Sequence, residues 1–272
     1  MSSPSILDKI SDQRRLDIAQ DKANLPLETL EAQLPQAPKV IDFHARLLAS
    51  APMAVIGEIK RASPSRGDID PTANAGEQAQ LYAEGGAAAI SVLTEPTWFK
   101  GHLNDLKAAR QAVAKLGEAA RPAILRKDFI FDRYQVYEAR VAGADTLLLI
   151  VAVLDDEQLL DLLTLSRSLG MEPLVEVNNE VEMARAIRIG ARVIGVNNRN
   201  LHTFTVDLTT TTELSSMVPA DVLLVALSGI TGYSDVKMFA EANARAVLVG
   251  ESLMRSKDKK IFIRQLLGQE TS

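Results

Sequence analysis

One short layout recurs four times along the chain and constrains its fold more than any other feature. The segments EGGAAAISVL, AGADTLLLIV, IGARVIGVN and ANARAVLVG each place Gly or Asn after an amphipathic stretch, then Ala, then an apolar run. Gly and Asn commonly close helices, so each segment indicates a helix followed by a buried strand. Aligned on Ala87, Ala144, Ala191 and Ala244, the copies stand 57, 47 and 53 residues apart. A single strand-helix unit takes roughly half of that interval, so another strand fits between each pair.

Eight apolar runs in fact alternate with eight amphipathic runs. We predict strands over 54–60, 88–95, 123–127, 145–153, 172–177, 192–197, 222–228 and 246–250. We predict helices over 72–84, 103–115, 133–142, 156–169, 179–189, 208–216, 233–241 and 258–267, the Thr-rich 208–216 being the weakest. Alternation of this kind indicates an α/β protein with a parallel sheet. Eight regular units favour a closed (β/α)8 TIM barrel over an open doubly wound sheet.

The length of 272 residues suits either two ordinary domains or one α/β barrel of roughly 250 residues. Because the pattern gives no sign of a second domain, we predict a catalytic barrel over 51–272, preceded by an N-terminal helical extension over 1–50. Two stretches of helical spacing, SILDKISDQRRLDIAQDK and VIDFHARLLAS, lie in this extension with a Pro-containing link at 35–38. These helices should pack on the barrel, or else cover one of its mouths.

Composition narrows the function. A net charge of −5 with 4% aromatic residues argues against a general nucleic-acid binder, which is usually basic. The absence of Cys excludes disulfides, a thiolate nucleophile and Cys-bound zinc. His44, His102 and His202 form no metal-ligand pattern, so we expect no metal site. The N-terminus is polar and no apolar run approaches the ~20 residues of a membrane span. We therefore expect a cytoplasmic protein that binds no membrane, with a monomer as the default.

Polar and charged residues stand where the predicted strands end, although a buried strand end is normally apolar or capped. They are Glu58, Lys60, Lys127, Glu176, Asn197 and Arg199. Such ends meet at one mouth of a barrel, where active sites of this fold lie. Glu58 and Lys60 share one face of their strand, because side chains two apart point the same way. They alone could be a stabilising ion pair, but charges from so many strands at one mouth indicate a catalytic site.

Two consecutive loops suggest what that site binds. LSGIT and VGESLM place Ser228, Gly229, Gly250 and Glu251 between a strand and a following helix. Free backbone N–H groups at such positions bind phosphate, and barrels often hold phosphate after strands seven and eight. The sequence therefore predicts a phosphorylated small molecule as the substrate, with an apolar wall of Phe99, Phe129 and Leu149 around its other end.

We expect acid–base catalysis by Lys and Glu, since the sequence shows no nucleophile triad. A Lys crowded by another Lys should have a lowered pKa, and a Glu in a dry site a raised one. A cationic Lys could also stabilise a developing oxyanion. The set suits enolisation, ring closure, dehydration, decarboxylation or Schiff-base chemistry on a sugar phosphate.

A family resemblance narrows this choice. GEIKRASPSRGDI, LTEPTWFKG, ILRKDFI, LLLIVAVL, PLVEVNNE, IGVNNRNL, SGI and LVGESLM resemble, in order and spacing, the indole-3-glycerol-phosphate synthase family. The resemblance runs from about residue 50 to the end and includes the extension more weakly. It implies a cofactor-free lyase of tryptophan biosynthesis. Such an enzyme converts 1-(2-carboxyphenylamino)-1-deoxyribulose 5-phosphate into indole-3-glycerol phosphate, CO₂ and water.

The resemblance also implies roles for the strand-end residues. Lys127 corresponds to the general acid of ring closure, and Glu176 to its partner in the later loss of hydroxyl. Lys60 corresponds to a phosphate ligand that can share the acid role, and Glu58 to the carboxylate that orients Lys and joins the closing proton transfer. Asn197 and Arg199 resemble a polar pair that bonds to substrate and to Glu58.

The remaining matched positions concern binding. Ser63 and Pro64 match a mobile first loop, and Phe99, Phe129 and Leu149 match the wall around the anthranilate ring. Ser228, Gly229, Gly250 and Glu251 match the phosphate site, the last two through backbone N–H groups.

One departure from the family pattern stands at residue 227. The family usually reads Glu-Ser-Gly at the end of strand seven, whereas this chain reads Leu227-Ser228-Gly229. The change removes a carboxylate beside Lys127 and Glu58 and makes the mouth more apolar. The sequence therefore leaves two alternatives open: a related phosphate-binding barrel with isomerase or Schiff-base lyase activity, and a catalytically weakened or regulatory barrel.

Overall fold

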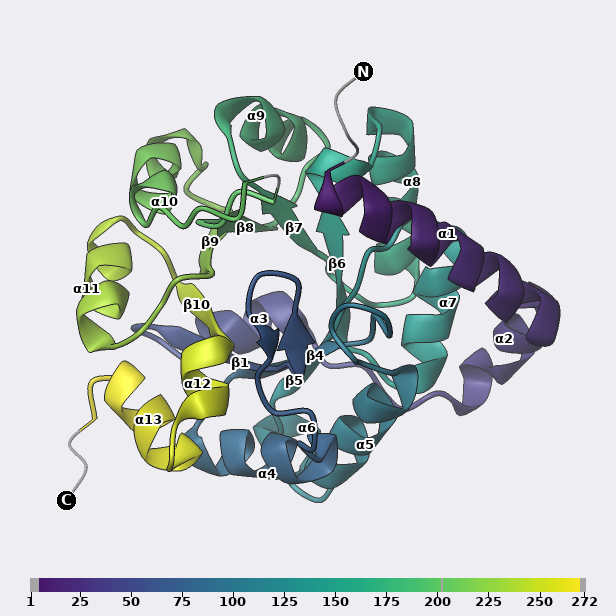
Figure 1. Ribbon diagram of the computed structural model, residues 1–272, viewed down its shortest axis with the longest axis horizontal. Coiled ribbons are helices and arrows are strands. Elements are labelled where there is room, and N and C mark those ends of the chain that lie inside the picture. The colour runs from purple at the N-terminus through teal and green to yellow at the C-terminus, as the bar shows by residue number, and fades with distance from the viewer. Residues whose placement is uncertain (1–4, 202, 270–272) are drawn as a thin grey trace.

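Eight parallel strands close into a barrel in the computed structural model, which describes residues 5–201 and 203–269 (Figure 1). The strands are β1 (Ala54–Ile59), β4 (Ala89–Leu93), β5 (Ala123–Lys127), β6 (Thr146–Ile150), β7 (Leu174–Val177), β8 (Val193–Asn197), β9 (Leu223–Leu227) and β10 (Ala246–Val249). Each pairs with the next, and β1 joins both β4 and β10 to close the ring. The predicted (β/α)8 barrel is confirmed.

Helices between the strands surround this ring, because each strand is buried on both faces and needs a cover. They are α4 (Ala75–Gly85), α5 (Leu103–Ala114), α6 (Gly117–Ala120), α7 (Arg133–Ala142), α8 (Asp156–Ser168), α9 (Glu180–Arg188), α10 (Thr209–Leu214), α11 (Tyr233–Glu241), α12 (Glu251–Arg255) and α13 (Lys259–Leu266). The short helix α12 follows β10 directly and was not predicted. The Thr-rich region gives a helix of only 6 residues, followed by the 3-10 turn η3 (Ser215–Met217).

The recurring Gly or Asn does close helices as predicted. Gly86, Gly143, Gly190 and Asn243 have φ values of 97°, 96°, 75° and 62°, in the left-handed region. In the copies at Gly86 and Gly143, the N–H of the following Ala bonds back to the last turn of the helix. The backbone thus reverses toward the next strand, which explains why one layout recurs around the ring.

Strand β6 is shorter than predicted. The sequence predicts a strand over 145–153, whereas β6 ends at Ile150 and the 3-10 turn η2 (Val151–Val153) follows. Arg185 on α9 donates hydrogen bonds to the carbonyls of Val151 and Leu154, at 3.0 and 2.6 Å. These carbonyls are therefore bonded to a side chain instead of a neighbouring strand, which apolar character alone does not reveal.

The N-terminal extension reaches both ends of the barrel. It contains α1 (Ile6–Asn24), α2 (Leu27–Gln33), the 3-10 turn η1 (Leu34–Gln36) and α3 (Phe43–Leu48). Arg14 on α1 forms a two-bond ion pair with Asp128, directly after β5, at 3.0 and 2.8 Å. The backbone N–H of Ile41, before α3, bonds to Asp145, which directly precedes β6. The extension therefore packs on the barrel at one mouth and lies against the other; its treatment as a separate domain stays a prediction.

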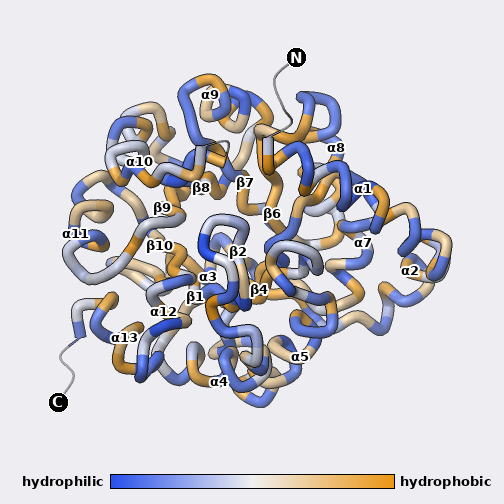
Figure 2. Tube along the Cα trace, viewed as in Figure 1, coloured by the Kyte–Doolittle hydropathy of each residue, from blue (hydrophilic) through white to orange (hydrophobic). Residues whose placement is uncertain are grey.

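The distribution of polar and apolar residues follows this architecture. Apolar positions concentrate along the barrel strands, and polar positions concentrate on the helices that surround them (Figure 2). Within the ranges that the structure describes, no helix has the length and apolar character needed to cross a membrane.

Candidate active site

A cavity of about 390 Å³ opens at the C-terminal ends of the strands. Its lining includes every site residue predicted from the sequence except Leu149. The predicted residues that line it are Glu58, Lys60, Ser63, Pro64, Phe99, Lys127, Phe129, Glu176, Asn197, Arg199, Ser228, Gly229, Gly250 and Glu251. The structure thus brings together residues that are up to 193 positions apart in the sequence.

Leu149 is buried on β6 but lies outside the cavity lining, whereas its neighbours Leu148 and Ile150 belong to it. Successive side chains of a strand point to opposite faces, so only alternate residues of β6 can face the inside of the barrel. The sequence LLLI is apolar on both faces, and it therefore gave no sign of which alternate set points inward.

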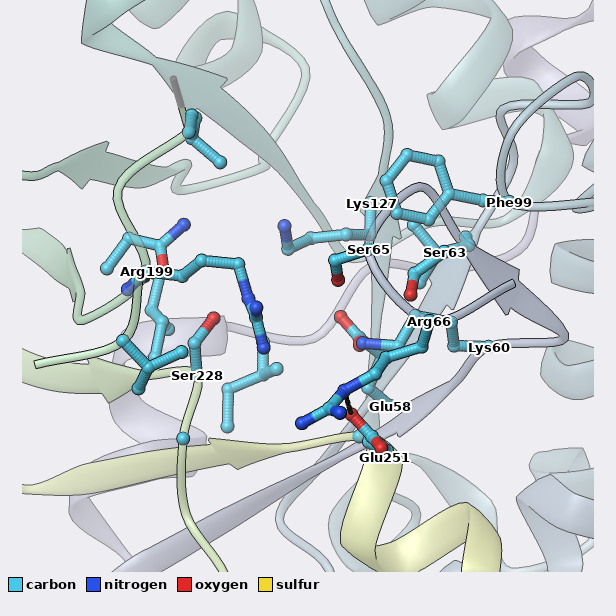
Figure 3. Close-up of a pocket in the computed structure, with 18 of the residues that line it drawn as sticks. Glu58, Lys60, Ser63, Ser65, Arg66, Phe99, Lys127, Arg199, Ser228 and Glu251 are labelled. Carbon is cyan, nitrogen blue, oxygen red and sulfur yellow. Dashed lines mark hydrogen bonds and ion pairs between the residues drawn. The ribbon is translucent and has the colours of Figure 1, made fainter. Parts of the chain in front are cut away.

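Two lysine–carboxylate pairs form the centre of the site. Lys60 Nζ lies 2.5 Å from Glu58 Oε1, and Lys127 Nζ lies 3.4 Å from Glu176 Oε2. Both carboxylates are buried, while about a fifth of each Lys side chain remains exposed to the cavity. Glu58, Lys127 and Arg199 converge on one space (Figure 3). In each pair the ammonium group is therefore accessible from the cavity, whereas the carboxylate is buried.

Asn197 holds Glu176 rather than Glu58. Its side-chain amide donates a 2.9 Å hydrogen bond to Glu176 Oε1, and its amide oxygen accepts the backbone N–H of Arg199 at 3.0 Å. The resemblance instead suggested a bond to Glu58. The difference follows from strand order, because β8 pairs directly with β7, which carries Glu176. Glu176 is therefore fixed between an amide and the ammonium of Lys127.

The pKa shifts of Glu58 and Lys127 are opposite in direction to those expected from the sequence. Burial acts to raise the pKa of Glu58, but the charges of Lys60 and Lys127, the Lys60 hydrogen bond and the charge of Arg199 together lower it below its usual range. Burial likewise acts to lower the pKa of Lys127, but Glu176 and Glu58 together raise it. The predicted crowding of Lys by Lys is outweighed, since each lysine lies against a carboxylate. Lys127 is therefore held as a cation by its two carboxylate neighbours.

The loops after β9 and β10 lie side by side in the cavity lining. Ser228 and Gly229 have φ values of 67° and 83°, so two consecutive residues of the first loop are left-handed. The side chain of Asn198 fixes this turn by donating to the Ser228 carbonyl at 3.2 Å. The hydroxyl of Ser252, on α12, donates to the Ile230 carbonyl at 2.7 Å and ties the two loops together.

Gly250 lies against the first lysine–carboxylate pair. A Cβ atom at this position would stand 2.4 Å from Glu58 Oε1 and 3.0 Å from Lys60 Nζ. A larger residue would therefore collide with this pair, so the close approach of Glu58 and Lys60 requires Gly here.

Gly250→Ala is therefore expected to keep the fold while displacing the Glu58–Lys60 pair. We expect kcat/KM for the substrate to fall by about 10²-fold, as for a displacement of roughly 1 Å of a catalytic group. The matched control is Gly232→Ala, because a Cβ at Gly232 would contact nothing within 4 Å. Equal kcat/KM in both variants, with unchanged Tm, would contradict the role given to this contact.

The aromatic side of the cavity is held by a buried carboxylate. Glu95, directly after β4, accepts the backbone N–H groups of Thr97, Trp98 and Phe99 at 2.8, 2.8 and 2.9 Å. The Phe99 and Phe129 rings lie 6.2 Å apart, within the range of aromatic contact. These two rings, together with Leu148 and Ile150 of β6, form an apolar part of the cavity that Lys127 also lines.

Leu227 lines the cavity at the end of β9, next to Asn197 in strand register. A Cβ at Gly195 would stand only 2.7 Å from Leu227 Cδ1, so the Leu side chain fills the space that this Gly leaves open. Leu227 is buried, and it contributes apolar surface to the cavity lining at this position.

Several lining residues were not found from the sequence. Ser65 and Arg66 lie at the turn of a small hairpin, β2 (Ala62–Ser63) and β3 (Gly67–Asp68), and Arg255 lies at the end of α12. Leu201, Phe204 and Val206 come from the loop after β8. The motif that contains Ser63 and Pro64 also contains Arg66, so its charge was a usable signal. The loop after β8 had no such signal, because it is folded over the cavity by the bridge between Arg199 and Val206 and by backbone hydrogen bonds, such as the one from Asp207 N–H to the Asn198 carbonyl at 2.8 Å.

The histidines lie outside the cavity lining where they can be placed. His44 belongs to α3, His102 precedes α5, and His202 lies outside the described residues. Among the described residues, no three His, Asp or Glu side chains gather as a metal site would require.

Comparison with known proteins identifies the family. The profile of the family described as indole-3-glycerol phosphate synthase matches residues 7–266. The chain belongs to this family. The chain is 45% identical to the indole-3-glycerol phosphate synthase of Roseiflexus sp. (strain RS-1), over 97% of this chain and 98% of that protein. The family match covers the N-terminal helices as well as the barrel.

Fungal relatives are more similar in sequence but longer. The multifunctional tryptophan biosynthesis protein of Schizosaccharomyces pombe is 57% identical over 98% of this chain, which spans only 35% of that protein. Among solved structures, 3-hexulose-6-phosphate synthase from Salmonella typhimurium superimposes with a TM-score of 0.63 at 16% identity, over 79% of this chain and 97% of that one. That likeness concerns the fold alone.

Proposed function

We propose that this barrel of the indole-3-glycerol phosphate synthase family converts 1-(2-carboxyphenylamino)-1-deoxyribulose 5-phosphate into indole-3-glycerol phosphate, CO₂ and water. The observation that carries the proposal is the arrangement of two lysine–carboxylate pairs around one cavity, with Lys127 cationic beside Glu176. The chain spans about a third of the length of its fungal relatives. The proposal therefore also covers the activity, the substrate and any partners of a longer protein that contains this chain.

The substrate has a phosphate at one end and an aromatic ring at the other, and the cavity offers a matching end to each. Ser228, Gly229 and the backbone N–H groups of Gly250 and Glu251 would bind the phosphate. Phe99 and Phe129 would hold the anthranilate ring, with Leu148 and Ile150 taking the place first given to Leu149. Lys127 and Glu176 lie between these two ends.

Ring closure would begin at the ribulose carbonyl. The aromatic carbon that bears the carboxylate attacks the carbonyl carbon, and the Lys127 ammonium gives its proton to the oxygen, which becomes a hydroxyl. The position of Lys127 in the cavity beside Glu176 supports this role, and its raised pKa means that the ammonium carries a proton to donate. Loss of CO₂ then breaks the bond to the carboxylate carbon and returns its electron pair to the ring.

Dehydration would complete the indole. The hydroxyl leaves as water with a proton from the Lys127–Glu176 pair, which is replenished from solvent. The methylene carbon beside the nitrogen loses a proton to Glu58, and the new double bond forms. The place of Glu58 in the cavity lining supports this assignment, and its lowered pKa means that the carboxylate is ionised before it accepts the proton. Lys60, bonded to Glu58, would bind phosphate and hold that carboxylate in place.

Schiff-base chemistry is less well supported than acid catalysis. A Schiff-base lysine must be neutral to attack a carbonyl, and its pKa is usually lowered by an apolar or cationic environment. Lys127 has the opposite environment, with Glu176 and Glu58 raising its pKa. Borohydride trapping with substrate distinguishes the two, because a stable covalent adduct on Lys127 would contradict the proposed function.

The direct test is the formation of indole-3-glycerol phosphate from the carboxyphenylamino sugar phosphate by the purified protein. We expect steady-state turnover without added metal or cofactor. A protein that binds the substrate but forms no indole product would refute the proposal.

Leu227→Glu tests whether this chain is a weakened relative. Leu227 is buried against Gly195, and the nearby lysines already have carboxylate partners. We expect the variant to unfold about 1–3 kcal/mol more easily, because a new buried carboxylate lacks a full set of partners. We also expect no gain in kcat.

Leu227→Gln is the control for Leu227→Glu, since it has a similar shape without the charge. Urea unfolding and steady-state rates measure both effects. Turnover that appears only in Leu227→Glu would instead establish a catalytically weakened or regulatory barrel. A cytoplasmic location and a monomeric state remain predictions from the sequence.

A further inference from the structure

The β2–β3 hairpin carries a cation across the mouth of the cavity. Arg66 lies at its turn, where Gly67 has a φ of 65°, and Arg66 Nε stands 3.3 Å from Glu251 Oε2 at the start of α12. Figure 3 shows this ion pair as a dashed line between the loop after β1 and the helix after β10. The pair therefore joins the first and last units of the barrel above the proposed phosphate loops.

The ion pair is exposed and easily exchanged. The Arg66 side chain is 58% exposed and the Glu251 side chain 29%. Exposed ion pairs of this kind contribute about 0–1 kcal/mol to the stability of the folded protein, because water and salt screen the two charges. Arg66 makes a single contact of 3.3 Å with Glu251, whereas Arg often binds a phosphate through two parallel charge-assisted hydrogen bonds. A bound phosphate could thus replace Glu251 as the partner of Arg66.

The charges at this end of the cavity do not balance. Glu251 also pairs with Arg255 at 3.3 Å, and Arg199 is within electrostatic range of Glu251, Arg66 and Glu58. The described charges that line this end are Lys60, Arg66, Arg199 and Arg255 against Glu58 and Glu251. The other charged lining residues have separate partners, since Lys127 faces Glu176 and Asp128 faces Arg14 and Arg126. Two positive charges are therefore left over, which matches a phosphate dianion.

We propose that Arg66 is a substrate ligand that binds the phosphate dianion, and that Glu251 holds Arg66 over the mouth until the phosphate arrives. This inference rests on the proposed function, and it adds a specificity residue from the hairpin. Because the hairpin also carries Ser63, Pro64 and Ser65 into the cavity lining, the exchange of partners would fix the hairpin over the bound substrate. The side chain of Glu251 would thus compete with the phosphate for Arg66, while the backbone N–H of the same residue binds the phosphate.

Titration calorimetry with inorganic phosphate at low ionic strength tests the proposal without requiring turnover. We expect Arg66→Gln to weaken phosphate binding about tenfold, as for the loss of a charge-assisted bond at a partly exposed site. Arg66→Lys should retain part of the affinity. Arg188→Gln is the matched control, because Arg188 forms an exposed ion pair with Asp156 and lies outside the cavity lining.

The decisive measurement is a double-mutant cycle. Glu251→Gln keeps the backbone N–H and frees Arg66, so we expect it to tighten phosphate binding several-fold. Most of that gain should disappear when Arg66 is already Gln. An unchanged phosphate affinity in Arg66→Gln, or strictly additive effects of the two substitutions, would overturn the role of Arg66. If the purified protein binds phosphate through Arg66 but forms no indole product, the proposed function fails while this inference stands.

Discussion

Lys127→Ala is expected to lower kcat by about 10²–10⁴-fold, the range lost when a general acid is removed. The Lys127 ammonium lies 3.4 Å from Glu176 and faces the space between the phosphate loops and the aromatic wall. Its removal takes away the proton for the carbonyl oxygen but leaves both ends of the cavity intact. Substrate should still bind, so equilibrium binding measured in the inactive variant should change far less than kcat.

Lys127→Arg separates charge from proton transfer. Arg keeps the positive charge but does not release its proton in proteins. If Lys127 acts as an acid, this variant should be nearly as slow as Lys127→Ala. If the positive charge alone stabilises the oxyanion, Lys127→Arg should recover much of the rate. Near wild-type rates in Lys127→Ala would exclude any catalytic role for this residue.

Asp128→Ala is expected to destabilise the protein by about 3–5 kcal/mol, the cost of leaving a buried charge without its partner. Asp128 accepts two bonds from Arg14 on α1, one from Thr94 at 2.7 Å and one from Arg126 at 3.1 Å. Its loss leaves two buried guanidinium groups with weaker compensation and removes one of the contacts that hold α1 on the barrel. Urea unfolding measures the change, and Asp161→Ala, which breaks an exposed pair with Arg133, should cost less than about 1 kcal/mol.

The same carboxylate predicts a dependence of stability on pH. Burial acts to raise the pKa of Asp128, but Arg14, Arg126 and the hydrogen bonds from Arg14 and Thr94 lower it from 3.8 to about 2. Because the folded pKa is the lower one, the stabilisation is complete above pH 3.8 and is lost as the pH falls toward 2. The shift corresponds to roughly 2 kcal/mol. Asp128→Asn should lack this part of the acid dependence, and an identical pH profile in the variant would contradict it.

Much of the fold and of the cavity was predictable from short patterns. The recurring Gly or Asn before Ala marks a helix end and a strand start by local backbone preference, so it predicts elements wherever it occurs. Glu58, Lys127, Glu176 and Asn197 were predictable as a cluster because the C-terminal strand ends of a barrel share one mouth. Phe204 was not, since the loop after β8 reaches the cavity through contacts that no periodicity encodes.

The sequence by itself determined the barrel, the family and the set of strand-end residues, because alternation, helix ends and motif order are local properties of the chain. Only the tertiary structure decided which of those residues face one another. A strand that is apolar on both faces does not reveal its inward side, so Leu148 and Ile150 replace Leu149 in the cavity. A pKa depends on distances between charges. The pKa of Lys127 is therefore raised by the nearby Glu176, whereas the sequence predicted that a neighbouring Lys would lower it. These outcomes depend on strand order and on spacing across the barrel, which exist only once the ring has closed.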